Sequence, residues 1–190
     1  MTTMARWEPD APKRLSKAAL ELFAERGYEN TTVVDIAARA GLTKSTFFRH
    51  FQDKREVLFG GSALADLLAE AVVAAPPAAT PVEAVICAMD AAAREAFTPE
   101  LREFSAQRRS VIAAHPELQE RDALKGLAII AAMTDALRRR GVAELTARVV
   151  AELGALAMKI GYERWIEGDA GDFGEAARRA LDEVQAAVAR

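Results

Sequence analysis

The feature that most constrains this chain is a tight turn at Gly41 between two short amphipathic segments. The first segment places Ile36 and Ala37 on one face, and the second places Phe47 and Phe51 four residues apart. Apolar residues at these spacings predict helices. A glycine in the turn lets the second helix project from the first. Neither helix is long enough to be stable alone, so both must pack against further helices.

Capping residues mark the ends of this unit. Residues 11–26 are predicted to form a supporting helix, which Gly27 ends as a left-handed residue. Thr32 and Asp35 form a pair that resembles a capping box at the start of the second helix, and Thr43 is the candidate N-cap of the third. The sequence therefore predicts a three-helix helix-turn-helix unit over residues 12–59, after an N-terminal arm of residues 1–11.

The remainder of the chain also has helical periodicity. Asp53 is predicted to cap a fourth helix that continues to about residue 74 and is bent or weakened at Gly60-Gly61. Residues 75–190 are predicted to form a second helical domain. Its helices are expected at residues 82–97, 99–115, 118–140, 144–167 and 173–189. Strands are not expected, so the fold class is all-α.

Composition and charge limit the location and the partners. The net charge is −3, yet residues 1–59 carry ten basic and eight acidic side chains. Five basic residues lie between positions 39 and 55, where Asp53 is the only acidic one. Such a cluster fits phosphates, although a solvated face gives the same pattern. The single cysteine and the lack of a membrane-spanning run favour a cytoplasmic protein with no membrane partner.

The segment that carries the function is the second helix of the helix-turn-helix. With Phe47 and Phe51 buried, its other face presents Lys44, Ser45 and Arg49. Small, polar and basic side chains on such a face suit entry into a major groove. The residues themselves therefore predict contact with double-stranded DNA.

Residues 27–51, which read GYENTTVVDIAARAGLTKSTFFRHF, resemble the DNA-binding signature of the TetR family of bacterial regulators. The continuation QDKREVL at residues 52–58 is similar to it too. The resemblance covers roughly residues 12–59 and implies a cytoplasmic transcriptional regulator, expected to be a repressor. The DNA-binding positions expected from the residues and the resemblance together are Thr32, Arg39, Thr43, Lys44, Ser45, Thr46, Phe48, Arg49, His50 and Lys54.

Several of these assignments have alternatives. A structural role explains Arg39 as well as DNA contact does. The alternative for Arg49 is a salt bridge with a neighbour, and the alternative for His50 is a surface cap. Phe48 stands where the family usually has tyrosine, so it lacks the hydroxyl that contacts phosphate, although its ring could pack on a thymine methyl. Ser45 replaces a frequent glycine.

The second domain is expected to pair two chains and to bind an effector. The resemblance implies a homodimer in which the last two helices form a four-helix bundle with their copies; the alternative is that both apolar stripes belong to the core of one chain. The expected interface residues are Val149, Leu153, Leu156, Ile160, Ala177, Leu181, Val184 and Val188. A largely apolar small-molecule effector is expected between the helices of residues 82–140. The candidate pocket residues are Met89, Arg94, Phe97, Phe104, Gln107, Arg108, Ile112, Ile130, Met133 and Thr134.

Two other classes of protein compete with a regulator. A helical-bundle enzyme is disfavoured because neither His50 nor His115 has a glutamate three residues before it, and no cofactor motif is present. We therefore expect no enzyme activity, no cofactor and no metal. A protein-binding adaptor is disfavoured because it does not need Lys44, His50 and Lys54 around a short capped helix.

Overall fold

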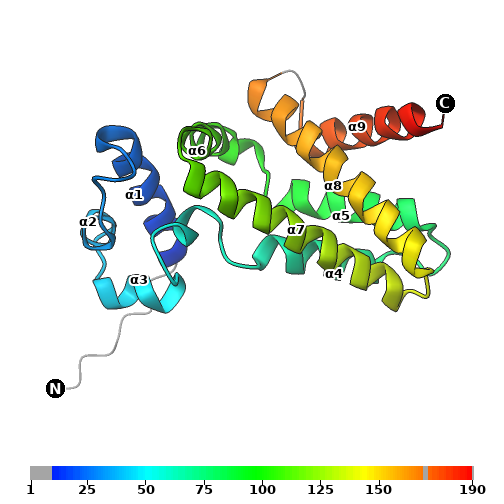
Figure 1. Ribbon diagram of the computed structural model, residues 1–190, viewed down its shortest axis with the longest axis horizontal. Helices are drawn as coiled ribbons and strands as arrows, with labels where there is room; N and C mark the ends of the chain where they lie inside the picture. Colours follow the sequence, from blue (N-terminus) through cyan, green and yellow to red (C-terminus); the bar gives the residue numbers. More distant parts are fainter. Residues whose placement is uncertain (1–9, 169–170, 190) are drawn as a thin grey trace. The chain divides into compact units, whose positions relative to one another are not determined.

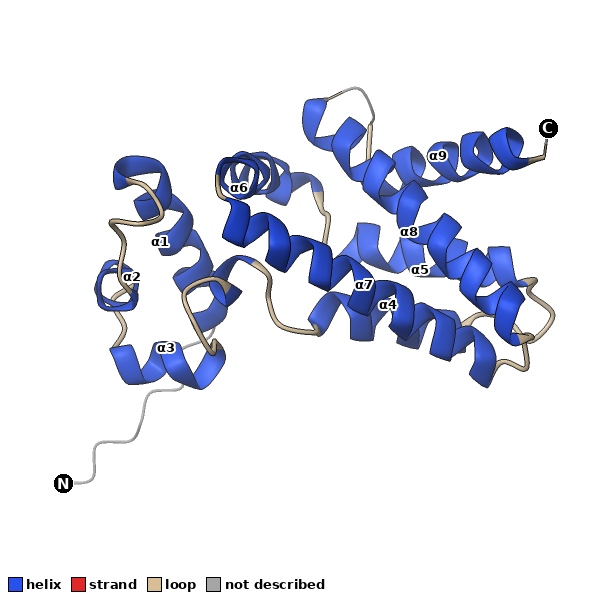
Figure 2. Cartoon of the chain, in the orientation of Figure 1, coloured by secondary structure: helices blue, strands red, loops and turns tan. Residues whose placement is uncertain are grey.

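The computed structural model describes residues 10–168 and 171–189, and all regular structure within these ranges is helical (Figure 2). The all-α prediction is therefore confirmed. The expected arm at residues 1–11 falls almost entirely outside the described residues. No described helix is long and apolar enough to cross a membrane.

The chain divides into two compact units, and the division does not follow the sequence in one step. Unit 1 contains the residues up to Gly61 together with residues 107–119, and unit 2 contains residues 62–106 and 120–190. A segment from the middle of the chain thus belongs to the N-terminal unit. No local pattern in the sequence indicates that this segment belongs with the N-terminal helices.

Unit 1 is built on three helices, α1 (Ala11–Arg26), α2 (Val33–Arg39) and α3 (Lys44–His50), drawn in blue to cyan in Figure 1. The short 3-10 turn η1 (Glu56–Leu58) follows. The unit also includes the end of α6 (Arg102–Ala114) and the first residues of α7 (Pro116–Arg139). Its core holds the expected apolar side chains of the two short helices, together with apolar side chains of α1. They are Ile36, Ala37, Phe47 and Phe51, with Leu15, Leu22 and Phe23.

The predicted fourth helix from Asp53 is wrong in its extent. Only η1 forms after Asp53, and α4 begins later, at Ala63 (Ala63–Ala74). Gly60 and Gly61 both have a φ of 65°, which lies in the left-handed region that only glycine adopts freely. Two consecutive residues of this kind end the helical path, so the glycines separate the two segments where a bend had been expected.

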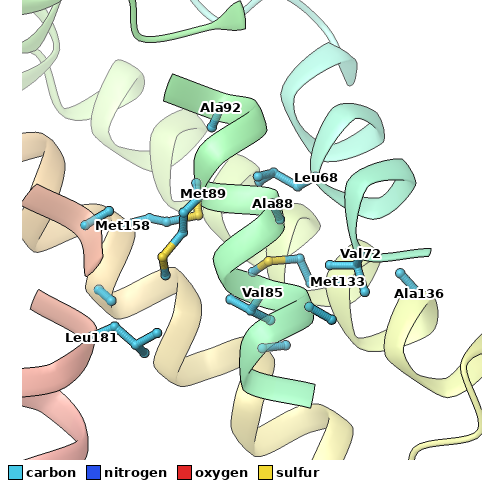
Figure 3. Close-up of a cluster of buried hydrophobic side chains, with 14 of the residues drawn as sticks. Leu68, Val72, Val85, Ala88, Met89, Ala92, Met133, Ala136, Met158 and Leu181 are labelled. Carbon is cyan, nitrogen blue, oxygen red and sulfur yellow. The ribbon is translucent and has the colours of Figure 1, made fainter. Parts of the chain in front are cut away.

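Unit 2 contains α4, α5 (Pro81–Glu95), η2 (Pro99–Leu101), the first turns of α6, most of α7, α8 (Glu144–Glu167) and α9 (Phe173–Val188). Helices α8 and α9 pack closely along one another. Gly161 makes this approach possible, because a Cβ atom built there would lie 2.6 Å from the backbone nitrogen and Cα of Ala177. Figure 3 shows the buried cluster that joins the helices of this unit, with Met89, Met133 and Met158 among its side chains.

Arg140 holds the turn between α4 and α5. Its guanidinium donates to the carbonyl oxygens of Ala75 at 2.7 Å and Pro76 at 2.8 Å. These carbonyls follow the end of α4, where helical partners are missing. Arg140, which directly follows α7, therefore stabilises the end of α4 and the turn after it.

Candidate DNA-binding interface

Helix α3 is fixed by a cap at one end and by two buried rings. The Thr43 hydroxyl accepts a hydrogen bond of 3.1 Å from the backbone N–H of Thr46, as expected of an N-cap. The rings of Phe47 and Phe51 are 0% and 4% exposed, and their centroids lie 5.5 Å apart. The predicted buried side of the helix is therefore confirmed.

The opposite face of α3 is open to solvent. Lys44, Ser45, Phe48 and Arg49 are all exposed, and His50 is exposed at the last position of the helix. The Lys44 ammonium lies 5.9 Å from the centroid of the Phe48 ring. Thr46 is half-buried, and its hydroxyl lies 3.0 Å from that of Thr43. The structure thus places most of the expected recognition residues on one accessible face.

The turn before α3 depends on Arg14, a residue that sequence reasoning missed. Gly41 has a φ of 67°, and a Cβ atom there would lie 3.0 Å from the Arg14 guanidinium. That guanidinium donates to the carbonyl oxygen of Ala40 at 2.5 Å, at the end of α2. Arg14 therefore connects α1 to the turn that sets the direction of α3. Nothing in the local sequence signals this contact, because the residues are 26 positions apart.

Thr32 forms the expected capping box at the start of α2. Its hydroxyl accepts from the backbone N–H of Asp35 at 3.2 Å, and the Asp35 carboxylate accepts from the backbone N–H of Thr32 at 2.9 Å. The Thr32 hydroxyl and backbone N–H, with Arg26 nearby, hold the pKa of Asp35 below its usual value. Because a carboxylate already occupies this helix start, the geometry favours a structural role for Thr32 over phosphate binding.

Arg39 points toward α1. Its two terminal nitrogens donate to the two carboxylate oxygens of Glu25, at 2.9 and 2.7 Å, and one of them also lies 3.5 Å from Glu21. The hydrogen bond from Arg39 lowers the pKa of Glu25, and the guanidinium pKa is raised in return. A bidentate pair satisfies the planar guanidinium well. The geometry therefore favours the structural explanation of Arg39.

Lys54 is held by Tyr28, the buried residue that follows the Gly27 turn. Its ammonium donates to the Tyr28 carbonyl oxygen at 2.8 Å and lies 3.9 Å from the ring centroid. The Tyr28 ring also lies 5.3 Å from the ring of His115, in the inserted segment of unit 1. Sequence reasoning identified Lys54 and missed both Tyr28 and His115, because no local pattern links these positions.

The expected pocket residues do not gather within one unit. Gln107, Arg108 and Ile112 belong to unit 1, where Arg108 Nε donates to the Leu58 carbonyl oxygen at 2.6 Å. The others belong to unit 2. Met89 and Met133 are completely buried in its core, and the Thr134 hydroxyl donates to the Ile130 carbonyl oxygen of its own helix. Arg94 is exposed, and Phe97 and Phe104 are half-buried. Arg108 therefore holds the end of η1, and Thr134 bonds within α7.

The expected interface residues separate into three groups by exposure. Ala177, Leu181 and Val184 of α9 are 0%, 3% and 9% exposed, because α8 and α5 cover them within the same chain. Leu153 and Ile160 are half-buried. Val149 and Leu156 on α8, each 46% exposed, and Val188 on α9, 67% exposed, remain accessible to a partner.

Comparison with known proteins finds a family match within unit 1. The model described as bacterial regulatory proteins, tetR family, matches residues 15–59. The transcriptional regulator TcmR of Streptomyces glaucescens is 41% identical over 73 residues, which are 38% of this chain and 32% of that protein. The chain thus matches about a third of the length of this curated relative.

Two solved structures are similar over nearly the whole chain. SmeT, the repressor of the Stenotrophomonas maltophilia multidrug efflux pump SmeDEF, has a TM-score of 0.57 at 24% identity, covering 94% of this chain and 90% of that one. The complex of SmeT with triclosan has the same TM-score at 21% identity, with 93% and 90% covered. At these identities the likeness shows a shared fold. The family match itself covers residues 15–59, so it is the helix-turn-helix segment of this chain that is similar to the tetR family of bacterial regulatory proteins.

Proposed function

We propose that the chain is a transcriptional repressor that binds a palindromic operator as a homodimer. The observation that carries this proposal is the exposed face of α3, on which Lys44, Ser45, Phe48 and Arg49 stand over the buried rings of Phe47 and Phe51. A short helix supported in this way, with polar and basic side chains outward, is suited to the major groove. The match of this segment to the tetR family supports the same function. The matches support neither the enzyme nor the adaptor alternative.

Selection of bound sequences from random duplex DNA tests the proposal. We expect a selected sequence with two-fold symmetry, whose half-sites are centred about 34–36 Å apart or a multiple of that distance. Lys44→Ala should weaken binding of this sequence at fixed salt. Lys17→Ala, which removes an exposed lysine from α1, serves as the matched control. Failure to enrich any sequence would overturn the proposal.

The proposed pairing surface is the exposed stripe of α8 with the end of α9. Val149 and Leu156 are spaced by two helical turns on α8, and Val188 is the most exposed of the three. We expect Leu156→Glu to shift the mass measured by light scattering from dimer to monomer. Glu70→Ala, an exposed substitution on α4 of the same unit, should leave the mass unchanged. A wild-type protein that is monomeric at micromolar concentration would contradict pairing.

Release by a small apolar molecule is the remaining part of the proposal. Its support is the SmeT–triclosan complex, a structure of similar fold with a bound ligand. Triclosan is therefore a reasonable first probe, together with a panel of apolar compounds. The expected result is dissociation of the protein from its selected sequence when an active compound is added. If no compound in the panel changes DNA binding, none of these compounds is the effector, and the proposal of a DNA-binding repressor still stands.

A further inference from the structure

Two neighbouring residues on the outer face of α3 differ from ordinary surface residues. Phe48 is 48% exposed, although its neighbours Phe47 and Phe51 are buried. In the described part of unit 1, Val34 is the only other large apolar side chain that is so exposed. The Lys44 ammonium, one helical turn before Phe48, lies 5.9 Å from its ring centroid. The two side chains therefore form one composite surface of a cation beside an aromatic ring.

The chemistry of this surface restricts what it can recognise. A phenyl ring has no hydroxyl, so it cannot donate a hydrogen bond to phosphate or to a base. In the major groove, the apolar group offered by the four bases is the C5-methyl of thymine, and the usual partner of a lysine is O6 or N7 of guanine. Arg49, exposed on the same face, adds positive charge that attracts the DNA backbone.

We propose that Phe48 selects thymine by packing its ring on the C5-methyl group, while Lys44 contacts a guanine close by. This inference rests on the proposed DNA binding and names the bases that the recognition helix reads. Four residues of helix advance by about 6 Å, and successive bases are about 3.4 Å apart. The guanine and the thymine are therefore expected within about two base pairs of one another.

Uracil substitution isolates the methyl group, because uracil pairs like thymine and differs from it at C5 alone. In the selected sequence, each thymine is replaced in turn by uracil, and affinity is measured by fluorescence anisotropy at fixed salt. One position per half-site is expected to lose about fourfold in affinity, the effect of one methyl-sized group. Phe48→Ala should abolish the loss at that position, and Phe48→Tyr should retain it.

Val34→Ala is the matched control, since it shortens the other exposed apolar side chain of the unit. The uracil penalty is expected to be the same in this variant as in the wild type, which separates direct contact from a change in DNA stiffness. Equal affinity for thymine and uracil at every position would overturn the inference and leave DNA binding intact. A penalty that persists in Phe48→Ala, or a selected half-site without thymine, would overturn it too. The absence of any specific sequence would overturn both proposals.

Discussion

The ammonium of Lys54 is 2.8 Å from the backbone carbonyl oxygen of Tyr28 and 3.9 Å from the centroid of its ring. The same ring contacts Phe23 of α1 at 5.1 Å and His115 at 5.3 Å between centroids. Tyr28 therefore joins three separate parts of unit 1. Lys54, which was expected to contact DNA, therefore also contributes to the packing of that unit.

Replacement of Lys54 should therefore affect both stability and DNA binding. Lys54→Met removes a cation–π contact and a hydrogen bond, so the free energy of unfolding is expected to fall by about 1–2 kcal/mol. In the wild type, the ammonium keeps two further N–H groups for a phosphate. Its loss should therefore reduce the slope of log affinity against log salt concentration by about one. Denaturant titration and binding at several salt concentrations measure the two effects. Lys17→Met is the control, and an unchanged unfolding midpoint in Lys54→Met would show that the Tyr28 contact contributes nothing.

The Tyr28 hydroxyl should ionise at unusually high pH. Burial, and to a smaller degree the charge of Glu117, raises the pKa of Tyr28 from 10.0 to about 12. A raised pKa stabilises the folded state below pH 10, and this contribution is lost as the pH rises from about 10 to about 12. The chain has two tyrosines, so Tyr162→Phe leaves Tyr28 as the only phenol for a titration by ultraviolet absorbance. A midpoint near pH 10 in the folded protein would contradict the predicted shift.

Arg39 and Lys44 should behave differently in DNA binding, although both are among the expected DNA-binding residues. Arg39 is bound to Glu25 by both terminal nitrogens, so Arg39→Ala should leave the salt dependence of DNA binding nearly unchanged. Lys44→Ala should weaken binding of the selected sequence by at least about fivefold, because it removes the contact proposed with guanine. Both variants are measured on the same DNA over a salt series. If Arg39→Ala lowers the slope of log affinity against log salt concentration by about one, Arg39 leaves Glu25 and contacts phosphate.

Two glycines in helices of unit 2 offer a matched test of packing. A methyl group at Gly161 would meet the backbone of Ala177 at 2.6 Å, whereas a methyl group at Gly126 in α7 meets nothing within 4 Å. Gly161→Ala is expected to lower the free energy of unfolding by about 2 kcal/mol, because α8 and α9 must separate. Gly126→Ala should raise it by about 0.5–1 kcal/mol through higher helix propensity. Thermal denaturation of both variants checks the sign of each change.

Local signals in the sequence predicted much of the fold. The boundaries of α8 follow from Gly141 and Gly168, and the short α3 follows from the Thr43 cap with the Phe47 and Phe51 pair. The prediction of the fourth helix was wrong because it treated two adjacent glycines as a bend within one helix. Their positive φ values end the helix outright, and that conformation depends on the chain around them.

Contacts between distant positions explain what the sequence could not predict about the candidate site. The bond from Arg108 to the Leu58 carbonyl oxygen spans 50 residues, and the contact of Arg14 with Ala40 spans 26. Periodicity assigns a face to a helix without naming its partner. Periodicity likewise could not identify the partner of α9. Its apolar stripe is covered by its own chain, because Gly161 has no side chain and α9 can pack close to α8.

The assignment of residues 107–119 to unit 1 has a consequence for protein engineering. A chimera that transplants only the first 61 residues onto a protein of similar fold would leave out the donor's His115 and Arg108, and with them the contacts to Tyr28 and Leu58. The transferable module is discontinuous in the gene. Exchange of DNA specificity between relatives should therefore carry both segments, or replace single residues on α3.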